Sequence, residues 1–189
     1  MKVLRLFTLL AVVLCLLVAC GPAATPTPIY QTVSAGTLSP GSTVPTPTGP
    51  VVLTVDGKIS QTNSGKTLQF DMATLESLGV VQYKVDDPFA KKSVLYAGVL
   101  LSQLLKVAGA APDATTLTLK ALDDYSTDMK ISDTNRWPII LATRADGAYM
   151  PVDKSGPLIS VFPFNNFPEI DHVTYDAQWL WSLAAITVK

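Results

Sequence analysis

The densest group of side chains with chemical potential is a set of four aspartates, Asp123, Asp124, Asp128 and Asp133. Several carboxylate oxygens close together can bind a hard cation such as Ca²⁺. Their spacing does not match the D-x-[DN]-x-[DN]-G calcium loop. A glycosidase pair is also unsupported, because adjacent residues of a strand point to opposite faces. We therefore interpret the cluster as a solvated strand edge and turn.

The chain has a single histidine, His172, which follows Asp171. A histidine beside a carboxylate can act as a proton shuttle, since imidazole changes charge near neutral pH. No serine lies in a G-x-S-x-G nucleophile elbow, so a hydrolase triad has no support. The pattern favours an exposed loop residue over a catalytic one.

The two cysteines, Cys15 and Cys20, both lie at the start of the chain. Lys2 and Arg5 precede an apolar run over residues 9–19 that is too short for a comfortable membrane span, which is typical of a signal peptide over residues 1–19. The sequence around Cys20, LVACG, resembles the lipobox of bacterial lipoproteins, in which the signal is cut before the cysteine and the thiol carries a diacylglyceryl group. The alternative is an ordinary signal peptide with an incidental cysteine.

Export and lipidation would leave the mature chain without a free thiol, and therefore without a disulfide, a thiolate nucleophile or a soft metal ligand. The formal net charge is −1, and removal of Lys2 and Arg5 leaves 12 basic against 15 acidic residues. No basic stripe with interleaved aromatic residues occurs, which argues against nucleic-acid binding.

Residues 20–50 follow the signal and are predicted to form a linker. Seven prolines, seven threonines and no charged residue occur between Gly21 and Pro50. This composition predicts an extended, mobile tether that would reach about 90 Å as polyproline helix and about 30 Å as a flexible coil. A PxxP ligand is the alternative, although an exported chain would not meet cytosolic SH3 or WW domains.

The remaining residues, 51–189, predict one α+β domain, rich in strands and with two short helices. Its centre is expected at 146–164, where a turn and an exposed loop over 152–156 lead into an apolar run over 157–164. That run and residues 139–142 are typical of buried strands. The helices are expected over 72–78, with Asp71 as N-cap, and within 96–109, ended by Gly109. Further strands are expected over 51–55, 66–70, 80–85, 116–121, 126–131 and 179–188.

Four segments of this domain carry motifs in a characteristic order. They are YAGVLLSQLL (96–105), DDYS (123–126), LATRADG with GPL (141–147 and 156–158) and WLWSLAAITV (179–188). They resemble, in turn, the aromatic-x-G-V-x-L-x-x-L-L segment, the D-G-Y corner, the L-A-x-x-x-D-G…G-P-L-R signature and the closing W-x-W-x-L-x-x-I-x-V of the sulfite-oxidase-like molybdopterin-binding domain family and its small exported members. The resemblance covers residues 51–189 and implies a mixed-sheet α+β fold with a β-grasp-like portion.

The resemblance also implies a molybdopterin cofactor, and three departures argue against one. Catalytic members of the family ligate molybdenum through a cysteine before the aromatic-x-G-V segment, but residues 80–92 contain none. Asp86 or Asp87 offers oxygen, which is a hard ligand and no electronic substitute for a thiolate. Where catalytic relatives commonly have arginine after G-P-L, this chain has Ile159. Only two arginines remain to hold the cofactor's phosphate.

Several polar-tipped side chains near the family's cofactor-facing loops are the candidate ligand-binding residues. By position they are Tyr83, Tyr96, Asp124, Tyr125, Arg136, Arg144 and Lys154. The tryptophans Trp137, Trp179 and Trp181 are interpreted as core residues rather than as a ligand-stacking platform.

The leading hypothesis is a lipid-anchored extracytoplasmic protein whose molybdopterin-binding-like domain lacks the molybdenum-ligating cysteine and serves as a non-catalytic binding or interaction module, with a small ligand or an envelope protein as partner. The second is an exported molybdopterin oxidoreductase, or an accessory to one, with atypical metal ligation. The third is a spacer whose domain recognises an envelope protein.

Overall fold

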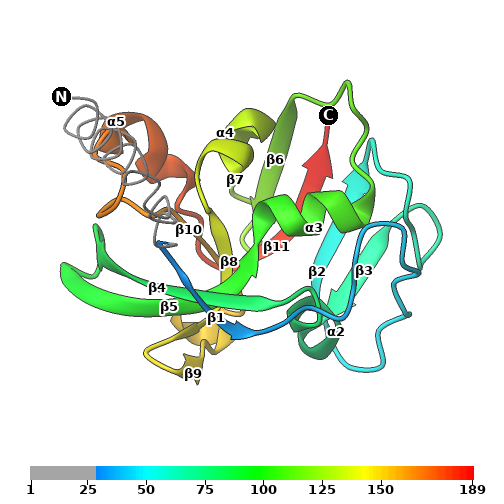
Figure 1. The fold of residues 1–189 in the computed structure, drawn as a ribbon, viewed down its shortest axis with the longest axis horizontal. Helices are drawn as coiled ribbons and strands as arrows, with labels where there is room; N and C mark the ends of the chain where they lie inside the picture. The colour runs from blue at the N-terminus through cyan, green and yellow to red at the C-terminus, as the bar shows by residue number, and fades with distance from the viewer. Residues whose placement is uncertain (1–28) are drawn as a thin grey trace, which may run out of the picture.

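The computed structural model describes residues 29–189, which fold around two sheets (Figure 1). In the first sheet, every pair of neighbouring strands is antiparallel. Its order is β1 (Gln31–Ser34), β4 (Val80–Asp87), β5 (Lys92–Leu100), β8 (Ile140–Ala145) and β10 (Ile159–Val161), with β9 (Ala148–Tyr149) paired to β8.

In the second sheet, β11 pairs in parallel with β2, and the other pairs are antiparallel. Its order is β3 (Leu68–Asp71), β2 (Val51–Gly57), β11 (Leu183–Val188), β6 (Thr116–Ala121) and β7 (Ser126–Lys130). The mixed α+β fold expected from the sequence is confirmed.

The described residues contain four short α-helices, where the sequence indicated two. They are α2 (Met72–Glu76), α3 (Leu101–Ala108), α4 (Ile131–Arg136) and α5 (His172–Tyr175), and the 3₁₀ turns η1 (Val152–Lys154) and η2 (Asp176–Gln178) accompany them. The two additional helices have only six and four residues, too few for a periodic apolar stripe to appear.

The helix expected within 96–109 is only partly correct, because residues 96–100 belong to β5. This end of β5 is paired with β4 on one side and β8 on the other, and burial on both faces removes the alternating pattern of a strand. Gly98 permits the close pairing, since a Cβ there would lie 2.1 Å from the Leu141 carbonyl oxygen. The chain then enters α3, which ends at Gly109 in the left-handed conformation as expected.

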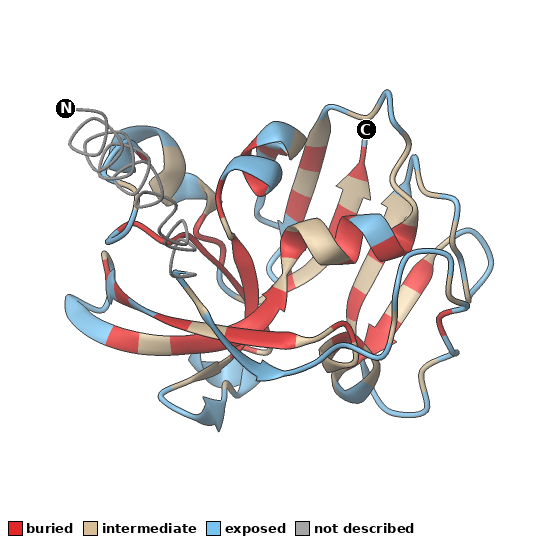
Figure 2. Cartoon of the chain, in the orientation of Figure 1, coloured by how far each residue is buried: buried red, intermediate tan, exposed pale blue. Residues whose placement is uncertain are grey.

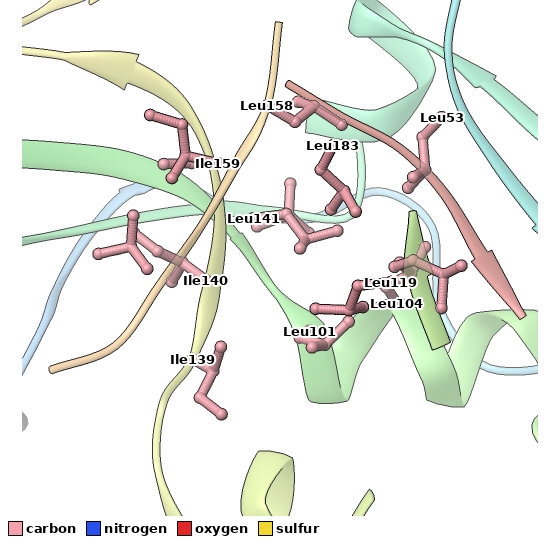
Figure 3. Close-up of a cluster of buried hydrophobic side chains, with 14 of the residues drawn as sticks. Leu53, Leu101, Leu104, Leu119, Ile139, Ile140, Leu141, Leu158, Ile159 and Leu183 are labelled. Atoms are coloured by element: carbon pink, nitrogen blue, oxygen red, sulfur yellow. The ribbon is translucent and has the colours of Figure 1, made fainter. Parts of the chain in front are cut away.

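The strands expected over 139–142 and 157–164 form as β8 and the shorter β10, and these two pair at the centre of the molecule, whereas residues 157–158 and 162–164 lie outside β10. Ala142 lies opposite Ile159, and Ile140 lies opposite Val161. Figure 3 shows Leu141 and Leu158 beside Leu183 of the second sheet, so this hairpin-like pair joins the two sheets through one core. Figure 2 shows that the buried residues of α3 form part of the same interior.

Residues 29–50 are not a free linker, contrary to the sequence interpretation. Gln31 and Thr32 pair with Gln82 and Val81, which adds β1 to the edge of the first sheet. Farther along, the side chain of Val44 is only 3% exposed. The folded domain therefore begins near Gln31 and not at Val51.

Backbone hydrogen bonds explain why this Pro/Thr-rich stretch is ordered. The carbonyl of Ser77 accepts from the N–H groups of Thr37 and Leu38, and the Asp71 carboxylate accepts from Thr48 and Gly49, each at 2.9 Å. The composition argument counted only apolar burial. It overlooked polar groups of the domain that satisfy the segment's backbone.

Asp71 also caps α2 as expected, because its carboxylate accepts a hydrogen bond from the Thr74 N–H at 2.8 Å. The expected signal peptide and the expected lipidation site, Cys20, lie outside the described residues. Within residues 29–189, no helix combines the length and apolar character that crossing a bilayer requires.

Candidate functional site

Two of the four motif segments, 123–126 and 179–188, and the loop that precedes the G-P-L motif meet around one cavity of about 610 Å³. Tyr125 follows β6, Ser155 precedes the G-P-L motif, and Trp181 precedes β11. The β4–β5 turn adds Phe89 to the opposite wall. We call this cavity the acidic cleft, after its three carboxylates, Asp123, Asp153 and Asp176.

A second cavity of about 380 Å³ adjoins the acidic cleft and shares Phe89, Ser155 and Trp181 with it. It is lined in addition by Lys92 and Lys154, and we call it the lysine cavity. Tyr96 of the 96–105 segment and Asp146 of the 141–147 segment contribute to this second cavity. All four motif segments therefore border one continuous region.

The β4–β5 turn is held by Asp87, which is buried. One of its carboxylate oxygens accepts from the N–H groups of Phe89 and Ala90, at 2.8 and 2.7 Å. The other accepts from the Tyr96 hydroxyl at 2.6 Å. Burial and this contact with Asp87 raise the pKa of Tyr96 well above its ordinary value, so the phenol keeps its proton. The network fixes the turn that presents Phe89.

Asp86, the neighbouring carboxylate, is exposed and bonded to Asn165. The Asn165 amide donates to Asp86 at 2.9 Å, and the Asp86 N–H donates to the Asn165 carbonyl oxygen at 2.7 Å. The hydrogen bond from Asn165 lowers the pKa of Asp86 below its ordinary value. Both acidic residues that the sequence offered as oxygen ligands thus have partners within the protein.

Phe89 and Trp181 meet edge to face, with ring centroids 4.7 Å apart and planes inclined at 71°. Each ring borders both cavities. Such an arrangement is favourable for aromatic pairs because the positive edge of one ring faces the negative face of the other. The pair forms the partition between the acidic cleft and the lysine cavity.

Trp179 forms a rigid part of the wall of the acidic cleft. Its side chain is 3% exposed and stacks parallel to Phe164, while Tyr96 meets it edge to face; both centroid distances are 5.7 Å. Its indole N–H has no hydrogen-bond partner among residues 29–189. A buried indole N–H usually donates a hydrogen bond, so an unpaired one in this wall is unusual.

The three carboxylates of the acidic cleft face little positive charge. Asp123 accepts a hydrogen bond from the Tyr125 N–H at 3.1 Å, and Asp176 lies 2.8 Å from Nδ1 of His172. Asp153 takes part in no ion pair within the described part of the chain. No lysine or arginine lines the cleft among these residues.

His172 forms its hydrogen bond with Asp176 and not with Asp171, the partner that the sequence suggested. Its ring also stacks on Phe164 at a centroid distance of 4.1 Å. Asp171 is instead the N-cap of α5, and accepts a hydrogen bond from the Val173 N–H. The expected exposed position of His172 is confirmed, although the residue begins a short helix instead of lying in a loop.

The structure brings together only some of the candidate ligand-binding residues. Tyr125 lines the acidic cleft, whereas Tyr96 and Lys154 line the lysine cavity. Asp124 is turned toward Lys120, 2.7 Å away, and does not line either cavity.

The other three candidates lie outside both cavities. Tyr83 is buried and donates to the Val161 carbonyl at 2.8 Å, because the alternation of β4 places it on the core face. Arg144 pairs with Glu76 and stacks on Tyr149, and Arg136 pairs with Glu169 at 3.5 Å. The two arginines are thus committed elsewhere on the surface.

The four aspartates at 123–133 do not converge on one point. Asp128 bonds to Thr118 on the edge strand pair β6–β7, as expected for a strand edge. Asp133 is instead buried in α4, which corrects its assignment to a solvated edge. Across residues 29–189, no three His, Cys, Asp or Glu side chains form a group suited to a metal ion.

Sequence reasoning missed Phe89 and misjudged Trp181. Phe89 lies in the β4–β5 turn and was not among the candidate residues, and Trp181 was assigned to the core although it is 40% exposed. Trp137 and Trp179 are buried as expected. A large aromatic residue in a charged turn was the available signal for Phe89, since exposed aromatic side chains often mark binding surfaces.

Comparisons with known proteins give a match to a solved structure that shares the fold and a match to a family model. Among solved structures, the crystal structure of the sulfane dehydrogenase SoxCD from Paracoccus pantotrophus has a TM-score of 0.55 and 16% identity to this chain. The match covers 72% of this chain and 37% of that chain, and at this identity the likeness shows the fold alone. A comparison with curated proteins gives no match.

The family profile of the oxidoreductase molybdopterin binding domain matches residues 69–166, more than half of the chain. The matched stretch includes the Tyr96 segment, the Asp123–Tyr125 corner and the G-P-L motif beside Ser155. The chain belongs to the oxidoreductase molybdopterin binding domain family.

Proposed function

We propose that this chain is a lipid-anchored, extracytoplasmic member of the family whose acidic cleft binds a small ligand and carries no molybdenum redox centre. One observation carries the proposal: the cavity formed by the family's motif segments presents three carboxylates and, among residues 29–189, neither a thiol nor a lysine or arginine.

The residues of the acidic cleft do not fit molybdopterin. The cofactor carries a phosphate, and phosphate binding favours arginine or lysine forks and backbone N–H nests. Asp123, Asp153 and Asp176 would instead repel that charge. Molybdenum in this family also takes a cysteine thiolate, whereas Cys15 and Cys20 are the only cysteines and both precede the folded domain.

The lysine cavity does not supply the missing positive charge in full. Lys92 lies 3.9 Å from the Asp146 carboxylate, which offsets part of its charge. Lys154 is exposed and carries a compact charge on a flexible stem, without the planar fork that binds phosphate through two bonds. Arg136 and Arg144 pair with glutamates outside both cavities.

Atypical ligation by carboxylate, the second sequence hypothesis, is also disfavoured by the contacts. The Asp87 oxygens are occupied by two N–H groups and the Tyr96 hydroxyl. Asp86 is bonded to Asn165 through both its carboxylate and its backbone. Freeing Asp87 for a metal would break the hydrogen bonds that hold the β4–β5 turn.

The anchor in this proposal rests on the sequence around Cys20. Because β1 begins at Gln31, only ten residues separate the lipidated cysteine from the folded domain. Even fully extended, such a segment reaches only about 35 Å. The domain would therefore remain close to the membrane surface, unlike the longer tether that the sequence suggested.

The test is to express the full chain in a host that makes molybdopterin and to measure molybdenum and pterin in the purified protein. We expect neither at stoichiometric level, with a catalytic family member purified in parallel as the loading control. Stoichiometric molybdenum and pterin in this chain would refute the proposed function.

A further inference from the structure

The acidic cleft combines accessible aromatic surface with negative charge. Phe89, Tyr125 and Trp181 are 43, 50 and 40% exposed, although each lines the cavity. Aromatic faces carry negative electrostatic potential and attract cations. The rings and the carboxylates therefore both favour a positively charged ligand.

The negative charge of the cleft comes from three separate segments. Asp123 follows β6, Asp153 lies in η1, and Asp176 begins η2. Clefts lined by one sign of charge concentrate ligands of the opposite sign. The three aspartates are far apart in the sequence, and the fold brings them together in one cleft that favours a positively charged ligand.

Trp179 contributes a buried part of the cleft wall. Its indole nitrogen is enclosed by the protein, so the contacts offered to a ligand come from the exposed rings of Phe89, Tyr125 and Trp181. The cavity volume of about 610 Å³ lies within the range of small-molecule sites.

We propose that the acidic cleft binds a small organic cation that carries an ammonium group. The ammonium group lies against the Phe89 and Trp181 rings within reach of the cleft carboxylates. This inference rests on the proposed function, since a phosphate-bearing pterin and an organic cation would compete for the same space.

Calorimetric titration of the full chain with choline tests the inference directly. The neutral isostere dimethylbutanol, in which a carbon replaces the quaternary nitrogen, isolates the contribution of the charge. We expect choline to bind about tenfold more tightly than the isostere, as cation–π contacts and carboxylates together warrant. Equal binding of the two compounds would overturn the inference.

Charge-removing variants locate the site. The double variant Asp153→Asn with Asp176→Asn is expected to weaken choline binding about tenfold. The matched control is Asp113→Asn with Asp128→Asn, which removes the same charge from two exposed residues that do not line the cleft. Equal weakening in both double variants, or in neither, would contradict the assignment.

The outcomes separate this inference from the proposed function. Protein that contains no molybdenum and does not bind choline would refute the cation site and leave the proposed function standing. Protein that contains stoichiometric molybdopterin would refute both. Circular dichroism of each variant confirms that a loss of binding does not come from unfolding.

Discussion

The Tyr96 hydroxyl donates a hydrogen bond to the Asp87 carboxylate across 2.6 Å, and this buried contact ties the β4–β5 turn to the middle of β5. The same carboxylate receives the N–H groups of Phe89 and Ala90. Asp87 thus holds in place the aromatic ring that divides the two cavities. In this chain a carboxylate stabilises the turn near which the family's redox members carry a metal-binding thiol.

Asp87→Ala should therefore destabilise the domain. Loss of the carboxylate leaves a buried hydroxyl and two N–H groups without their acceptor, and we expect the free energy of unfolding to fall by about 2–4 kcal/mol. Urea unfolding followed by circular dichroism measures the change. Asp113→Ala, at an exposed residue paired with Lys58, serves as the control and should leave stability nearly unchanged. Similar effects of the two substitutions would show that Asp87 holds nothing in place.

Asp71 provides a prediction about pH. The N–H groups of Thr74, Gly49 and Thr48 donate to its carboxylate and hold its pKa well below the ordinary value. The stability that this ion contributes is present above the ordinary carboxyl pKa of about 3.9 and is lost as the pH falls toward the lowered pKa of the folded state.

Asp71→Asn should consequently cost stability at neutral pH and progressively less in acid. We expect a deficit of about 1–3 kcal/mol at pH 7, because a neutral amide oxygen accepts weaker hydrogen bonds than the carboxylate does from the N–H groups of Thr74, Thr48 and Gly49. The deficit should shrink between about pH 5 and about pH 2, as the wild-type carboxyl gains a proton. Urea unfolding at several pH values measures it, and a deficit independent of pH would contradict the assignment.

The two arginines allow a comparison between a sheltered and an exposed ion pair. Arg144 donates to Glu76, which also accepts from the Tyr149 and Thr143 hydroxyls at 2.9 and 2.6 Å. Because this network is largely shielded from solvent, Arg144→Ala should lower the free energy of unfolding by about 1–2 kcal/mol. Arg136→Ala breaks the exposed pair with Glu169 and should have much less effect on urea unfolding. The reverse order would refute the structural role given to Glu76.

The proposed anchor predicts the distribution of the chain between membrane and soluble fractions. Cys20→Ser removes the thiol that would carry the diacylglyceryl group, so the variant should leave the membrane fraction on cell fractionation. Two acyl chains give stable anchoring, and no other anchor is proposed. Retention of the variant in the membrane fraction to the wild-type extent would contradict lipidation at Cys20.

Much of the fold could be predicted from local pattern. Residues 139–142 and 157–164 form nearly uninterrupted apolar runs, which are typical of strands buried on both faces. The Asp71 cap and the Gly109 stop follow from backbone needs that few residues meet. The position of Tyr83 on the core face was also readable, because a two-residue spacing puts it on the same face of β4 as Val81 and Val85.

The rest depends on contacts that no local pattern encodes. The segment 29–50 is ordered by distant acceptors such as Ser77 and Asp71, so its own composition is uninformative. Phe89 lies between β4 and β5 of the first sheet and Trp181 precedes β11 of the second, so their contact, and the acidic cleft that both rings border, exist only in the tertiary structure. The sequence could show which chemical groups were available, but not which of them would share a cavity.

The most direct test of the central claim is a crystal structure of the full chain purified from a host that makes molybdopterin. The account predicts no pterin between Trp181 and Asp153, and no anomalous scattering at the molybdenum edge in the acidic cleft or the lysine cavity. A pterin in either cavity, with molybdenum bound to oxygen ligands of this chain, would contradict it.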